Sequence, residues 1–119
     1  MEMVNAKIKS TYLGFEGHGI LTATLNLDYG NSQQSFGGYG LYGETRNDKS
    51  CNYAGFFIQR ILKTVGVDEW GDLSGKYIRV MLDRNMIDGI AHIVEDRWFH
   101  PREEFIKFEA DFGRKNIQT

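Results

Sequence analysis

The residues at 97–102 read Arg-Trp-Phe-His-Pro-Arg and bring two aromatic rings, an imidazole and two guanidinium groups together. A pocket for a nucleotide needs such a set, because a ring can stack on a base and a guanidinium can hold a phosphate. The alternative interpretation is structural: Trp98 and Phe99 would close the core where a strand gives way to a helix, and the two arginines would be solvated.

A glycine-rich run lies earlier, at 33–41, with the sequence QQSFGGYGL. Glycines let a backbone approach a flat or crowded group closely, so this run is a candidate ligand contact. It is not followed by Lys-Ser or by a helix start, which is evidence against a P-loop or a dinucleotide-binding turn. The structural alternative is that its glycines form a bulge or let Phe36 and Tyr39 lie across neighbouring strands.

Metal and catalytic chemistry receive little support from the sequence. His18, His92 and His100 lack a close ligand spacing, so ordinary surface or partly buried imidazoles are the better interpretation. No serine lies in a nucleophile-elbow motif. General acid–base catalysis stays open because almost any domain carries carboxylates and histidines, but no pair stands out. We therefore predict no metal and no cofactor, and the sequence singles out no catalytic residue.

The charge balance limits the partners. The chain of 119 residues carries 14 basic and 16 acidic side chains, for a net charge of −2. A protein that neutralises the phosphates of duplex nucleic acid usually carries a basic excess, so we expect no such partner. A local basic pocket is compatible with this balance. Lys76, Arg79 and Arg84 either form a positive edge on the second predicted hairpin or only protect a strand edge from aggregation.

Cysteine content and hydropathy predict the compartment. Cys51 is the single cysteine, so an internal disulfide is excluded and a reducing compartment is the natural interpretation. No run approaches the roughly 18 apolar residues of a membrane helix, and the polar residues 1–5 lack the apolar core of a signal peptide. We expect a soluble, cytosolic protein.

Hydrophobic periodicity predicts the elements that position these residues. Residues 21–29 alternate between apolar and polar, which is typical of a strand with one buried face. Strands at 7–12 and 33–41 flank it across turns rich in glycine and asparagine. The first forty residues therefore predict a three-stranded antiparallel meander. A polar loop follows at 42–52.

The second half of the chain predicts two helices. Apolar residues repeat with helical spacing over 54–65, and Gly66 is typical of a left-handed helix end. A single helical turn, packed by Trp70, is expected within 67–73. Pro101 suits the first turn of another helix, in which acidic residues follow and phenylalanines repeat on one face.

A second hairpin lies between the helices. Segments 77–82 and 86–94 are rich in Ile, Val and Met, and Asp-Arg-Asn between them is a plausible short turn. We expect one α+β domain over residues 1–119, with an antiparallel β-sheet built from the N-terminal meander and this hairpin, packed by two helices.

Eight short motifs are distributed over most of the chain, from residue 7 to about residue 105. They are YLGF at 12–15, GHGI at 17–20, LDYG at 27–30, FGGY at 36–39, RIL at 60–62, VGVDEW at 65–70, GKYIRV at 75–80 and DRWFHP at 96–101. Each motif is unspecific, but in this order they resemble the first family of phage Thoeris anti-defence proteins.

The resemblance implies a protein that sequesters a signal. Members of the family bind cyclic ADP-ribose isomers made by bacterial TIR-domain enzymes, and some also bind cyclic oligonucleotides, without cleaving the ligand. Sequestration deprives the downstream defence effector of its signal. Members assemble as homodimers, and some as hexamers, with the ADP-ribose isomer in pockets where subunits meet. For this chain the resemblance implies a sponge that acts in the host cytoplasm.

Such a ligand offers an adenine face, two phosphates and ribose hydroxyls, and side-chain chemistry suggests which residues hold each. The candidates are Trp98 or Phe99 for the base, Arg79, Arg84 and Arg102 for the phosphates, Asn85 and His92 for polar contacts, and Gln34 and Tyr39 as outer contacts. Burial of both phosphates against preorganised guanidinium groups is how a small pocket reaches high affinity.

Two other functions stay open. An enzyme that cleaves the cyclic signal would need a poised base or a metal. An inhibitor that binds a defence enzyme would instead show an exposed apolar patch and no affinity for nucleotides. The phenylalanines at 105, 108 and 112 fit either a subunit interface or such a patch.

Overall fold

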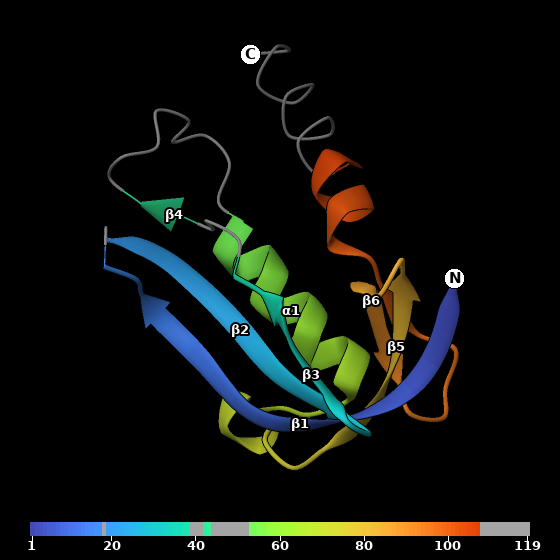
Figure 1. The fold of residues 1–119 in the computed structure, drawn as a ribbon. Helices are drawn as coiled ribbons and strands as arrows, with labels where there is room; N and C mark the ends of the chain where they lie inside the picture. Colours follow the sequence, from blue (N-terminus) through green and yellow to red (C-terminus); the bar gives the residue numbers. More distant parts are fainter. Residues whose placement is uncertain (18, 39–41, 44–52, 108–119) are drawn as a thin grey trace.

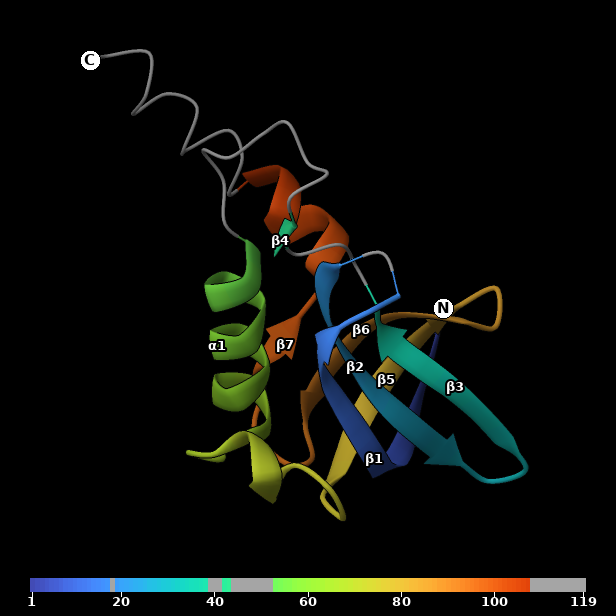
Figure 2. The ribbon, with the colours of Figure 1, turned by 90° about the vertical axis from the view of Figure 1, so that its left-hand side faces the viewer.

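An antiparallel sheet with a helix packed against one face forms the framework of this computed structural model (Figures 1 and 2). The structure describes residues 1–17, 19–38, 42–43 and 53–107. The elements are β1 Glu2–Phe15, β2 Ile20–Tyr29, β3 Ser32–Gly37, β4 Tyr42–Gly43, α1 Tyr53–Val65, the 3₁₀ helix η1 Trp70–Asp72, β5 Tyr77–Asp83, β6 Met86–His92 and β7 Trp98–Phe99, with a further helix at 101–107.

The sheet has the strand order β3-β2-β1-β5-β6-β7, and β4 pairs with β2 beside this path. The predicted meander is β1-β2-β3, and the predicted hairpin is β5-β6. Together with α1 and the helix at 101–107 they confirm the predicted α+β fold. The short strands β4 and β7 were not predicted, because two residues are too few to show a period of two.

Strand β1 is longer than predicted and joins the meander to the hairpin. Its first half pairs with β5, from Glu2 opposite Leu82 to Lys7 opposite Tyr77. Its second half pairs with β2, and the register shifts between Ile8 and Ser10. Such an irregularity bends a strand and increases its twist. The single strand therefore belongs to both halves of the sheet and lets them curl around the core.

The curl brings two strands together that are not neighbours in the pairing order. Strand β3 is separated from β6 by β2, β1 and β5. Even so, the side-chain amide of Gln34 on β3 hydrogen-bonds to the backbone of Asn85 and Ile87 in the β5-β6 hairpin. The sheet therefore closes on itself at this point through a side chain rather than through a strand ladder.

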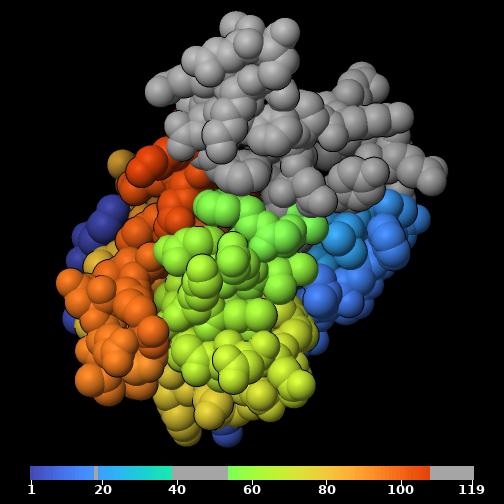
Figure 3. Space-filling model, turned by 180° about the vertical axis from the view of Figure 1, so that it is seen from behind, coloured from blue at the N-terminus to red at the C-terminus, as the bar shows by residue number. Residues whose placement is uncertain are grey.

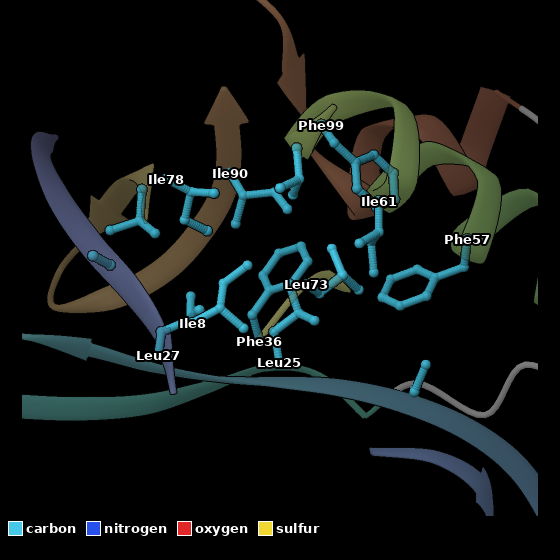
Figure 4. Close-up of a cluster of buried hydrophobic side chains, with 14 of the residues drawn as sticks. Ile8, Leu25, Leu27, Phe36, Phe57, Ile61, Leu73, Ile78, Ile90 and Phe99 are labelled. Carbon is cyan, nitrogen blue, oxygen red and sulfur yellow. The ribbon is translucent and has the colours of Figure 1, made fainter. Parts of the chain in front are cut away.

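The core lies between the curled sheet and α1. Phe57 and Ile61 of α1 are fully buried against the strands. The ring of Phe57 lies 5.6 Å from the ring of Phe99 and 6.2 Å from that of Phe36, measured between centroids (Figure 4). Large buried rings contribute much of the packing free energy of a small domain. The predicted helix face at 54–65 is therefore confirmed as the face that covers the sheet.

The predicted helix end and connector are also confirmed. Gly66 has a φ of 89°, and the N–H of Val67 donates to the carbonyl of Leu62 over 3.1 Å, as expected for a left-handed stop. The 3₁₀ turn η1 follows, and its Trp70 packs against the core while its indole N–H donates to Thr11 Oγ1.

Within the described residues, no helix has both the length and the apolar character needed to cross a membrane.

Several predictions concern residues outside the described ranges. They are the loop at 44–52 with Cys51, the ligand contact Tyr39, the imidazole of His18 and the phenylalanines at 108 and 112.

Candidate ligand-binding pocket

A cavity of about 460 Å³ lies between β3, the β5-β6 hairpin and the start of the helix at 101–107. We call it the hairpin pocket. Its lining residues are Gln34, Ser35, Phe36, Gly37, Asp83, Arg84, Met86, Ile87, Asp88 and Arg102. Three of the predicted contacts, Gln34, Arg84 and Arg102, therefore meet at one cavity although they are far apart in the sequence. Its size is that of a small-molecule site.

The turn of the hairpin positions Arg84. Asp83 pairs with Met86, so Arg84 and Asn85 alone make the turn. Their φ angles are 53° and 66°, the conformation of the tight turn that suits the twist of a hairpin. Asparagine adopts this region readily, whereas arginine rarely does, because its Cβ approaches the following carbonyl. The backbone therefore holds Arg84 in an unfavourable conformation at the mouth of the pocket.

Arg84 and Arg102 are exposed, and neither has a hydrogen bond or ion pair with another residue that the structure describes. They come from different elements, so the pocket presents two guanidinium groups from two directions. Guanidinium groups bind phosphates through paired N–H donors. Asp83 and Asp88 also line the pocket, which limits its positive charge and favours a ligand with polar groups beside its phosphates.

Asp88 is close to an imidazole. Its Oδ2 lies 3.3 Å from Nδ1 of His100, a nitrogen that is buried and has no hydrogen bond of good geometry. The His100 ring lies over Gly89, where a Cβ would come within 2.3 Å of Nδ1. The glycine is therefore required for His100 to approach the hairpin. This pairing was not predicted, because twelve residues separate its members.

The amide of Gln34, which lines the hairpin pocket, joins β3 to the β5-β6 hairpin. Its Nε2 donates to the carbonyl of Asn85 and, over 2.7 Å, to the hydroxyl of Tyr29. Its Oε1 accepts from the N–H of Ile87 over 3.3 Å. Asn85, predicted as a polar contact of the ligand, does not line the pocket, and its backbone carbonyl accepts the hydrogen bond from Gln34.

Arg79 and His92 lie elsewhere and serve a structural purpose. Arg79 donates from Nε to the carbonyl of His92 over 2.9 Å and from a terminal nitrogen to the carbonyl of Glu95 over 2.7 Å. Nδ1 of His92 accepts from the N–H groups of Val94 and Glu95. We call residues 92–98 the supported segment. Arg79 does not line the hairpin pocket, and two of its nitrogens donate to backbone carbonyls of this segment, so its assignment to a phosphate stays a prediction that this geometry does not support.

The two aromatic candidates for base stacking are also engaged. Phe99 is 0% exposed and packs on Phe57, so it belongs to the core and has no face for a base. Trp98 is half-buried between the guanidinium of Arg79, at 5.3 Å, and the ring of His100, at 5.7 Å. The structural interpretation of this aromatic pair, that it closes the core at the end of the strand, is the correct one for Phe99.

Arg60, on helix α1, is also engaged with other parts of the protein. It forms a bond of 2.7 Å to Glu104, donates to the carbonyl of Trp98 over 2.8 Å and lies over the ring of Phe99. The pair joins α1 to the helix at 101–107. Its signal in the sequence is absent, since the two residues are separated by 44 positions.

A second hollow, of about 640 Å³, lies beside the end of α1. Figure 3 shows α1 next to the orange segment that contains Arg97 and Trp98. Lys63 and Arg97 line it, together with Thr64, whose buried hydroxyl has no hydrogen-bond partner among the described residues. Of the eight predicted contacts that the structure describes, Trp98 alone lines this hollow. Its arginines, Arg60 and Arg97, pair with glutamates, so it offers less free charge than the hairpin pocket.

Within the described ranges, no group of three or more His, Cys, Asp or Glu residues comes close enough together to bind a metal ion. Comparisons of the chain with family models, curated proteins and solved structures give no match.

Proposed function

We propose that this protein binds and sequesters a cyclic nucleotide immune signal without cleaving it, as a phage protein in the host cytoplasm. The ligand class is a cyclic ADP-ribose isomer, with cyclic oligonucleotides as a second class. The observation that supports this most strongly is the convergence on one cavity of Arg84 and Arg102, whose guanidinium groups have no partner among the described residues. The motif resemblance supplies the identity of the ligand.

The pocket matches the parts of such a ligand. Two phosphates joined in a ring need two cationic groups from different directions, and Arg84 and Arg102 supply them. Met86 and Ile87 contribute apolar surface for a base or a ribose. The phosphates would bind in place of water, with no proton transfer needed, so tight binding alone performs the function.

Assembly into a homodimer or hexamer is part of the proposal. Tyr12, Leu13 and Phe15, at the tip of the β1-β2 hairpin, are exposed, as is Ile106 of the last helix. Exposed large apolar side chains that cluster at one tip favour association. Residues of a neighbouring subunit would then complete a pocket that one chain leaves open.

The proposal is tested by mixing the purified protein with cyclic ADP-ribose isomers and cyclic oligonucleotides, removing free ligand, and then denaturing the protein by heat. Recovery of intact ligand only after denaturation is the expected result. The double variant Arg84→Ala/Arg102→Ala should release none, while the matched variant Arg97→Ala should release as much as the unmodified protein. Ligand that stays free throughout would sink the proposal and favour a protein partner.

An enzyme that cleaves the signal is a second candidate, and the proximity of Asp88 and His100 favours it. A carboxylate that lines the pocket, with an imidazole behind it, is an arrangement that can move a proton. In the same experiment an enzyme would yield altered ligand, and Asp88→Asn would then prevent the alteration. Intact ligand from the unmodified protein excludes this candidate.

A further inference from the structure

The hydrogen bonds of Gln34 resemble those of a base edge. Asn85 contributes a carbonyl, which can only accept, and Ile87 contributes an N–H, which can only donate. These two partners fix the orientation of the amide, with Nε2 toward Asn85 and Oε1 toward Ile87. The second hydrogen on Nε2 is directed to the hydroxyl of Tyr29. One planar group thus satisfies three partners, and two of the four residues involved, Gln34 and Ile87, line the hairpin pocket.

Adenine carries the same groups in the same order. Its amino nitrogen N6 and its ring acceptor N1 are both bonded to C6, just as the nitrogen and oxygen of a side-chain amide are bonded to one carbon. N6 also carries a second hydrogen on its other side. The edge could therefore donate to the Asn85 carbonyl and the Tyr29 hydroxyl while accepting from the Ile87 N–H.

We propose that the backbone of Asn85 and Ile87 reads the base of the ligand, and that Gln34 occupies this base-edge site while the protein is free. The inference rests on the proposed function and adds to it the selection of adenine. Gln34 would leave when adenine enters, and the exchange replaces each hydrogen bond with an equivalent one. The hairpin that carries Arg84 at its turn would thus bind the base and a phosphate with adjacent residues.

The site should reject bases with the opposite pattern. Hypoxanthine and guanine present a carbonyl oxygen at C6 and an N–H at N1. The oxygen would face the Asn85 carbonyl, so two acceptors would meet. The N–H at N1 would face the N–H of Ile87, so two donors would meet. A site that hydrogen-bonds one pattern discriminates against the opposite one, because each mismatched group faces another of its own kind.

The experiment compares two ligands on the unmodified protein by titration calorimetry. One is a cyclic ADP-ribose isomer in which N1 of adenine is free, and the other is its hypoxanthine counterpart. The hypoxanthine ligand should bind about 10- to 100-fold more weakly. Equal affinities would overturn the base-edge inference while leaving the proposed function in place. If neither ligand binds, the proposed function fails and this inference fails with it.

The variant Gln34→Ala tests whether the backbone of Asn85 and Ile87, rather than the side chain of Gln34, recognises the base. Because Gln34 competes with the base for the same atoms, its removal should leave adenine affinity unchanged or raise it by up to about tenfold, with discrimination retained. Loss of discrimination would mean that Gln34 itself reads the base and would overturn the inference. Gln33→Ala, on the exposed neighbour that does not line the pocket, is the matched control and should change neither value.

Discussion

The supported segment and the hairpin pocket use the same residue type in opposite ways. At the supported segment, Arg79 donates to backbone carbonyls and lies over Trp98, and Arg60 beside it binds Glu104 and the Trp98 carbonyl. At the hairpin pocket, Arg84 and Arg102 have no partner within the described residues. The first pair completes hydrogen bonds that the fold needs, and the second pair remains available to a ligand.

This difference shows where stability and binding should be separable. A guanidinium that satisfies protein acceptors leaves them unpaired when it is removed, so its loss costs folding free energy. A guanidinium in solvent at a cavity costs the fold little when it is removed. Substitutions at the supported segment should therefore lower stability, and substitutions at the hairpin pocket should lower affinity for a nucleotide.

Phe99→Ala should have the largest effect. Phe99 is fully buried against Phe36 and Phe57, so truncation should lower the free energy of unfolding by about 3 to 5 kcal/mol. Chemical denaturation measures this. Tyr77→Ala, at a side chain that is 59% exposed, is the matched control and should change stability by less than about 1 kcal/mol. A small loss of unfolding free energy in Phe99→Ala would contradict its role in the core and leave it as a candidate ligand contact.

Arg102→Ala should weaken binding of the cyclic nucleotide by about 1.5 to 3 kcal/mol, the contribution of a hydrogen bond to a charged group. Its unfolding free energy should stay within about 0.5 kcal/mol of the original. Titration calorimetry and denaturation on the same sample give both values. Arg97→Ala should leave affinity unchanged. If Arg102→Ala bound as well as the unmodified protein, the site assignment would be wrong.

Arg60→Ala should lower stability and leave affinity for the ligand unchanged. Arg60 and Glu104 are 27% and 28% exposed, so water screens the pair in part and the expected loss of stability is about 1 to 2 kcal/mol. Affinity for the ligand should be preserved. Lys63→Ala on the same helix is the matched control. A loss of affinity without a loss of stability would indicate that the ligand binds near the end of α1 instead.

Arg84→Asn should change stability and ligand affinity in opposite directions at one position. Asparagine tolerates the φ of 53° better than arginine does, so the free energy of unfolding should rise by about 0.5 kcal/mol. Affinity should fall, because the guanidinium is lost. A variant that loses stability would show that the Arg84 side chain supports the turn.

The sequence predicted the fold well where residues repeat with a regular period. Residues 21–29 alternate and form β2, residues 54–65 follow a helical period in α1, and Gly66 ends that helix. The curl of the sheet could not be predicted, because it depends on the irregularity near Ile8 and on the contact of Gln34 with the hairpin. Both are consequences of tertiary packing.

The candidate site was predicted only in part. Residue chemistry identified Arg84, Arg102 and Gln34, which meet at one cavity, but it also chose Arg79 and Phe99, which do not line it. The residue types alone do not distinguish the residues that line the cavity from those that do not. Whether an arginine is available depends on the acceptors that the fold places around it, and backbone carbonyls such as those of His92 and Glu95 leave no trace in the sequence.

One NMR spectrum can test directly whether the ligand contacts Arg84 and Arg102 and not Arg60 and Arg79. The protein is labelled with ¹⁵N, the Nε–H resonances of its arginine side chains are assigned, and a cyclic ADP-ribose isomer with a free adenine N1 is added. We predict that the resonances of Arg84 and Arg102 shift and those of Arg60 and Arg79 keep their positions. Shifts confined to Arg60 and Arg79, or no shift at any of the four, would contradict the account.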